Sequence, residues 1–108
     1  MSFEYFFEFY NKNDESWDDL VCKLKKSIYY VGEGSMSCLM FRDLDIKSDW
    51  SYDLRIFINK NYTFFFELGG WSDGLFKEFK ELLSKEEFGI IEVDDDEIVS
   101  LEKVFRKI

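Results

Sequence analysis

The sequence predicts an α+β fold: a mainly antiparallel sheet of four to five strands with two or three helices packed mostly on one face. Several segments alternate apolar and polar residues with the two-residue period of a half-buried strand. Others carry apolar residues at the 3.6-residue period of an amphipathic helix. Short connections between consecutive strands favour antiparallel pairing. The 108 residues, 46% of them hydrophobic, fit one domain over residues 1–108.

The first half of the chain predicts a strand, a helix and a second strand. Residues 3–10 alternate, with an aromatic residue at every odd position. Ser16 and Asp19 have the spacing of a capping box at the start of a helix. A turn is expected at the Gly32–Gly34 segment, and a strand over residues 35–42. The apolar stripe of the helix is Trp17, Leu20, Val21, Leu24 and Ile28.

The second half contains the clearest pairing. Residues 52–58 and 62–68 both alternate and are joined by a short polar connection, which predicts a β-hairpin. A helix capped by Ser72 or Asp73 follows. Gly89 is expected to end this helix in the left-handed backbone conformation that glycine favours. Residues 90–93 predict the last strand. The order is therefore β-α-β-β-β-α-β-α, with an expected core of Phe7, Leu20, Leu24, Ile56, Phe64, Phe66, Phe79 and Leu82.

The spacing of apolar residues predicts a helix over residues 97–108. Ile98, Leu101, Phe105 and Ile108 follow a helical period, and the acidic run before them suits a helix N-terminus. Strand alternation fits this segment less well, because Lys103 would share a face with Leu101.

Charge and composition exclude several classes of function. The chain has 14 Lys+Arg against 23 Asp+Glu, a net charge of −9, which disfavours binding to nucleic-acid phosphates and favours a cationic partner. It has no His, so neither a Ser-His-Asp nor a Cys-His arrangement can form. Residues 1–4 lack the features of a signal peptide, and no apolar run approaches the ~20 residues of a membrane span. Cys22 and Cys38 are expected to be reduced core residues without a disulfide, in a cytoplasmic protein.

Two acidic clusters are the candidate binding sites. The first consists of Asp43, Asp45, Asp49, Trp50 and Asp53, and a Trp among carboxylates is typical of a protein interface. A calcium loop fits this cluster poorly, because Lys47 occupies a ligand position and the central Gly and final Glu are absent. We therefore expect it to be the main partner-binding patch.

The second cluster is Asp94, Asp95, Asp96 and Glu97. These acids could stabilise a helix N-terminus, chelate magnesium or act as paired catalytic carboxylates. Neither a Gly-rich phosphate loop nor an accompanying base supports the catalytic reading. We expect a second partner-binding patch, in a protein that is not an enzyme and holds no cofactor or metal.

A small, acidic, aromatic-rich domain with this order of elements resembles the immunity proteins of contact-dependent growth inhibition and related polymorphic toxin systems. The resemblance covers length, composition and layout across the whole chain. It implies a cytoplasmic monomer that binds one cognate toxin domain, often a basic nuclease, and blocks its active site or substrate groove without contacting nucleic acid or membrane. The alternative is an acidic DNA mimic of the anti-restriction or anti-defence type. Basic residues interrupt the acidic pattern that a mimic needs: Lys23, Lys25, Lys26, Lys103, Arg106 and Lys107.

Overall fold

The computed structural model describes residues 3–45 and 52–107. The α+β class predicted from the sequence is confirmed, but the sheet has seven strands rather than four or five. The elements are, in chain order, β1 (Phe3–Phe9), α1 (Asp14–Lys25), β2 (Tyr30–Glu33), the 3₁₀ helix η1 (Ser35–Ser37), β3 (Leu39–Phe41), β4 (Leu54–Ile58), β5 (Thr63–Leu68), α2 (Asp73–Leu82), β6 (Phe88–Glu92), β7 (Glu97–Val99) and α3 (Leu101–Val104).

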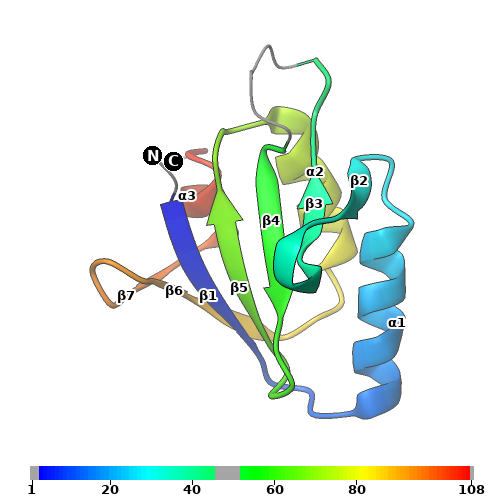
Figure 1. Cartoon of the computed structure of the whole chain (residues 1–108). Coiled ribbons are helices and arrows are strands. Elements are labelled where there is room, and N and C mark those ends of the chain that lie inside the picture. Colours follow the sequence, from blue (N-terminus) through cyan, green and yellow to red (C-terminus); the bar gives the residue numbers. More distant parts are fainter. Residues whose placement is uncertain (1–2, 46–51, 108) are drawn as a thin grey trace.

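The sheet has the order β2-β3-β4-β5-β1-β6-β7, and every neighbouring pair is antiparallel (Figure 1). The N-terminal strand β1 lies inside the sheet, where Phe7 pairs with Phe64 of β5 on one side and with Ile90 of β6 on the other. The predicted hairpin is confirmed as β4 and β5, with Ile56 opposite Phe66. The first strand of the chain is therefore an interior strand of an open sheet whose edges are β2 and β7.

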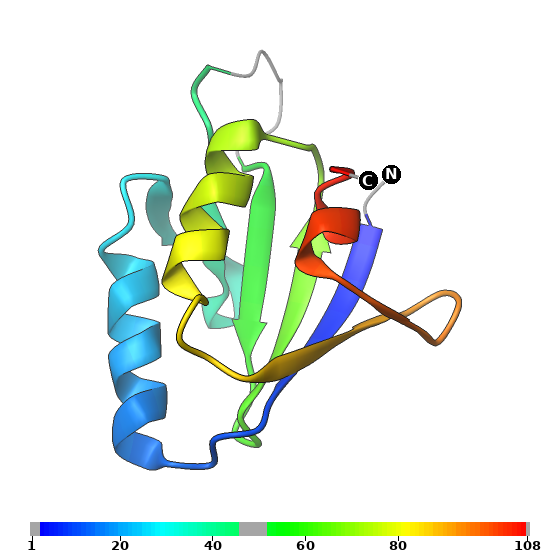
Figure 2. The same ribbon diagram turned by 180° about the vertical axis from the view of Figure 1, so that it is seen from behind.

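The helices cover one face of the sheet, as the sequence predicted. Figure 2 shows α2 and α3 across this face, and α1 lies beside α2 and β2. The side chains of alternate strand residues point toward the helices and form the core. Of the eight predicted core residues, seven are buried and Leu82 is partly buried against them. Figure 1 views the molecule from the opposite face of the sheet.

The helix starts are set by side-chain caps. Asn13 caps α1, accepting a hydrogen bond from the Ser16 backbone N–H at 2.9 Å, so the predicted capping box at Ser16 is wrong. Ser72 caps α2 as predicted, accepting from the Leu75 N–H at 3.1 Å. Because α1 ends at Lys25, Ile28 lies beyond the helix and is 86% exposed instead of completing its apolar stripe.

The segment between α1 and β4 differs from the prediction. Residues 30–33, partly assigned to a turn, form β2, and the register shifts near Gly32, whose φ of 133° favours glycine. The predicted strand over residues 35–42 is reduced to β3, because residues 35–37 form η1. Cys38 is buried as expected, whereas Cys22 is exposed on α1, and both are free thiols.

The C-terminal third also differs. Gly89 lies in β6 and not at a helix end, and the Tyr10 hydroxyl lies too close to residue 89 to leave room for a Cβ there. Residues 97–107 begin with β7 and continue into the four-residue helix α3, so the predicted helix over 97–108 is wrong. Ile98 pairs with Ile91 of β6, and the acidic run before it forms the hairpin turn, with Asp96 at φ 52°.

Candidate functional site

Two of the five members of the first predicted patch are buried in the fold. Asp43 and Asp53 are only 8% and 3% exposed. The Asp53 carboxylate accepts a hydrogen bond from the Asp43 backbone N–H at 2.8 Å. Asp43 in turn accepts from the Asp45 N–H at 3.0 Å and from the Ser72 hydroxyl. These two carboxylates therefore connect the end of β3 and the start of β4 to the start of α2 by hydrogen bonds.

The remaining members of that patch have different positions. Asp45 is exposed, while Asp49 and Trp50 lie outside the described residues. Partner binding by this patch stays a prediction. Within the described part of the chain, Asp45 is its one member that presents a carboxylate freely to solvent.

The second predicted patch is exposed. Asp94, Asp95 and Asp96 lie at the turn of the β6–β7 hairpin, which extends beyond the body of the sheet (Figure 1). Carboxylate oxygens of Glu92, Asp95 and Glu97 lie within 4.8 Å of one another, so these three residues could hold a divalent cation. A basic group near this patch is Lys103, whose Nζ is 3.5 Å from Glu97 Oε2. The turn is thus a local concentration of negative charge.

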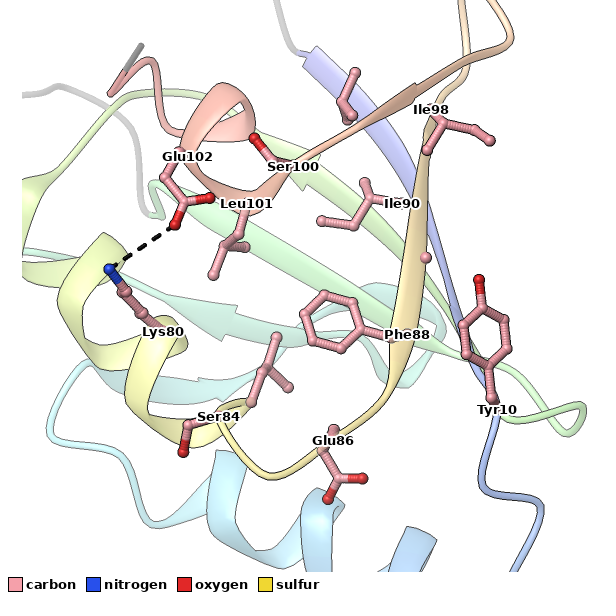
Figure 3. Close-up of a pocket in the computed structure, with 13 residues that line it drawn as sticks. Tyr10, Lys80, Ser84, Glu86, Phe88, Ile90, Ile98, Ser100, Leu101 and Glu102 are labelled. Atoms are coloured by element: carbon pink, nitrogen blue, oxygen red, sulfur yellow. Dashed lines mark ion pairs between the residues drawn. The ribbon is translucent and has the colours of Figure 1, made fainter.

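A hollow with a volume of about 500 Å³ lies between α2, β6, β7 and α3 (Figure 3). Its floor is apolar, and Lys80 and Glu102 form an ion pair of 3.8 Å at its rim. Both serines of the lining are engaged in helix ends: the Ser84 hydroxyl donates to the Glu81 carbonyl, and Ser100 Oγ accepts from the Lys103 N–H. This lining therefore offers mainly apolar contact, with one ion pair at its rim.

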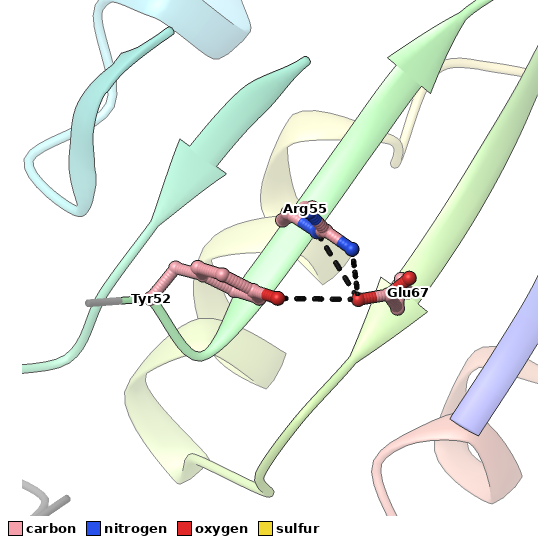
Figure 4. A network of polar contacts seen from close by, with 3 residues as sticks. All are labelled: Tyr52, Arg55 and Glu67. Carbon is pink, nitrogen blue, oxygen red and sulfur yellow. Dashed lines mark hydrogen bonds and ion pairs between the residues drawn. The ribbon is translucent and has the colours of Figure 1, made fainter. Parts of the chain in front are cut away.

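A polar cluster lies on the sheet face opposite the helices (Figure 4). Arg55 of β4 donates to Glu67 Oε1 from Nε at 3.1 Å and from Nη2 at 2.6 Å. The Tyr52 hydroxyl donates to the same oxygen at 3.3 Å, and the guanidinium lies 4.7 Å from the Tyr52 ring centroid. Burial opposes the charge on Arg55, but the hydrogen bond and charge of Glu67 outweigh it and raise the pKa of Arg55. Arg55 and Glu67 thus form a fixed, mutually neutralised pair.

This pair is not among the site residues predicted from the sequence, although the alternation of the two strands contains a signal for it. Arg55 and Glu67 occupy polar positions of the two predicted hairpin strands, and they are directly opposite each other in the observed register. Counting outward from the hairpin turn would have placed them side by side.

The Tyr52 hydroxyl predicts a measurable pH response. Burial, together with the charge and hydrogen bond of Glu67, raises the pKa of Tyr52 above its ordinary value of 10.0, against the opposing effect of Arg55. The folded state therefore holds this proton more tightly than the unfolded state, so stability falls as the pH rises from 10 through the raised pKa. Urea unfolding between pH 9 and 11 should show a shallower decline for Tyr52→Phe than for the wild type, with Tyr10→Phe as the control. Equal declines for Tyr52→Phe and the wild type would contradict the raised pKa.

None of the described helices is long and apolar enough to cross a membrane. Comparisons of the chain with protein-family models, with curated protein sequences and with solved structures find no match.

Proposed function

We propose that the chain is an inhibitory binding protein of the immunity type, which neutralises a basic toxin domain by covering its active site or substrate groove. The observation that carries the proposal is the projecting β6–β7 hairpin. Its turn presents Asp94, Asp95 and Asp96 to solvent in a chain of net charge −9. A basic groove that binds nucleic-acid phosphates attracts such a group of carboxylates.

The hairpin acts first on the rate of encounter. Exposed charges attract a partner over a Debye length, about 8 Å at 0.15 M salt, and orient it before contact. Among the described residues, only Glu97 of the acidic run forms an ion pair, with Lys103, so the three aspartates of the turn keep their long-range field. The net charge opposes association of two copies, which favours a monomer that forms a heterodimer with a cationic protein, in the cytoplasm where the toxin acts.

The described structure favours this proposal over a DNA mimic. A mimic needs a continuous series of carboxylates at phosphate-like intervals. Here Lys103 contacts Glu97 and Lys107 contacts Asp73, so bases stand next to acids on the C-terminal side of the molecule. Exposed acids also occur on α1, but the turn of the β6–β7 hairpin places three aspartates in a row.

Neutralising the turn should slow association. In the variant Asp94→Asn/Asp95→Asn/Asp96→Asn, we expect the association rate constant for the toxin domain, which we expect to be encoded beside the gene, to fall about tenfold at 50 mM salt, with little change in dissociation. At 500 mM salt the difference should nearly vanish, because the charges are screened. Stopped-flow fluorescence or surface plasmon resonance measures both rate constants.

The matched control is Glu15→Gln/Asp18→Asn/Asp19→Asn, which removes the same charge from exposed positions on α1. Because α1 lies near the opposite edge of the sheet, beside β2, this variant should associate at close to the wild-type rate. Equal slowing by both variants would show that net charge, and not the hairpin, steers the partner. If the wild-type chain neither binds that domain nor protects cells that express it, the proposed function is wrong.

A further inference from the structure

A row of apolar side chains crosses the sheet on the face opposite the helices. In the observed register, Phe57 of β4 is opposite Phe65 of β5, and Phe65 is opposite Phe6 of β1. Phe6 is opposite Ile91 of β6, and Ile91 is opposite Ile98 of β7. Directly opposed residues of neighbouring strands project from the same face. We call these five residues the apolar row: Phe57, Phe65, Phe6, Ile91 and Ile98.

The apolar row is open to solvent. Ile98 is 81% exposed and Ile91 is 38% exposed, and the three phenylalanines are half-buried. Helices α2 and α3 lie on the other face (Figure 2). A solvated face of an antiparallel sheet normally carries polar residues, and contiguous exposed apolar side chains mark interaction surfaces. The aromatic rings of Phe57 and Phe65 lie 5.9 Å apart, so the central part of the row is continuous.

Charged residues flank the apolar row on both sides. Along one side, Arg55, Glu67 and Glu4 lie in register, and on the other side Glu8 is opposite Gly89. Arg55 and Glu67 neutralise each other at 2.6 Å, which leaves the carboxylates of Glu4 and Glu8 beside the row. An apolar centre with a polar rim is the usual anatomy of a protein interface, and here the rim is negative.

The apolar row is also continuous with the acidic turn. Ile91 and Ile98 lie on the two strands whose connection carries Asp94, Asp95 and Asp96. A cationic partner attracted to the turn therefore lies next to the end of the apolar row that Ile91 and Ile98 form. The turn can supply the rate of encounter, and desolvation of the row can supply slow dissociation.

From this juxtaposition we propose that the apolar row is the contact centre for a basic protein partner. The inference rests on the proposed function and names the surface that performs it. Charge selects a basic partner over a second copy of this chain, because face-to-face association of two copies would bring together two molecules of net charge −9 with Glu4 and Glu8 at each interface.

The test uses the full chain and the basic toxin domain that we expect to be encoded beside its gene. The variant Ile91→Ser/Ile98→Ser should weaken binding at least about tenfold, mainly through faster dissociation. The separate variant Phe65→Ala should weaken binding more than Ile91→Ser/Ile98→Ser does. Unfolding curves test whether both variants remain folded at the assay temperature. The matched control is Ile28→Ser, because Ile28 is 86% exposed in the connection between α1 and β2, at the other edge of the sheet.

Each result decides between the surfaces. Weaker binding by both apolar-row variants with wild-type binding by Ile28→Ser supports the inference. Wild-type affinity of folded apolar-row variants overturns it and leaves the proposed function standing. Failure of the wild-type chain to bind the domain overturns the proposed function and the inference with it. A wild-type dimer in light scattering that becomes a monomer in Ile91→Ser/Ile98→Ser assigns the row to a second copy and also overturns the inference.

Discussion

Phe66→Ala is expected to lower the free energy of unfolding by about 3–5 kcal/mol. Phe66 lies on the helix-covered face of β5 and is fully buried. Its ring centroid is 4.7 Å from that of Phe7 and 5.6 Å from that of Phe79, and it also meets the ring of Phe105 at 6.2 Å. The substitution removes these contacts and leaves a cavity that rings from β1, α2 and the segment after α3 cannot fill without moving.

The neighbouring residue provides the control. Phe65 is next to Phe66 on the same strand but points to the opposite face, where it is half-buried. Phe65→Ala should therefore lose well under half as much stability. Urea unfolding followed by far-ultraviolet circular dichroism measures both, with similar m-values expected. Equal losses for the two variants would contradict the assignment of Phe66 to the core face and Phe65 to the open face.

The long strands and the core could be predicted because their pattern is local. In β1, β4 and β5 an apolar residue recurs at every second position, and a shift by one residue would move the whole set to the other face. The polar connection between β4 and β5 fixes which strands pair. The same alternation also predicts the open face, since Phe6, Phe57 and Phe65 occupy the outward positions.

The edge strands could not be predicted in the same way. β2 has four residues and β7 has three, too few for a period to be distinguished. The run that ends in Glu97 suits both a helix N-terminus and a hairpin turn, because its acids satisfy either. What decides between them is the pairing of Ile98 with Ile91, which follows from the position of β6 in the sheet.

The burial of Asp43 and Asp53 in the first predicted patch could not be predicted from the sequence, for a different reason. Carboxylates are almost always exposed, so sequence reasoning places Asp43 and Asp53 at the surface. The structure buries them because each has partners: a backbone N–H for Asp53, and for Asp43 the Ser72 hydroxyl, 29 residues further along the chain. No local pattern connects Asp43 to Ser72.

Asp43→Ala should accordingly destabilise the fold and lower the free energy of unfolding by about 2–4 kcal/mol. The substitution leaves the Ser72 hydroxyl and the Asp45 N–H without their acceptor. Ser72 also caps α2 through the Leu75 N–H, so the start of this helix should loosen. The carboxylate lies beside Gly74 in the first turn of α2, where a negative charge is stabilised by the helix dipole.

Two variants separate this structural role from a role in binding. Asp45→Ala removes an exposed carboxylate two residues away and should change stability by no more than about 0.5 kcal/mol. Asp43→Asn keeps an oxygen acceptor and should fall between the wild type and Asp43→Ala. Urea unfolding gives the stabilities, and partner affinity is measured where each variant is fully folded. Unchanged stability of Asp43→Ala with lost affinity would assign Asp43 to the interface, whereas lost stability with retained affinity assigns it to the junction between β3, β4 and α2.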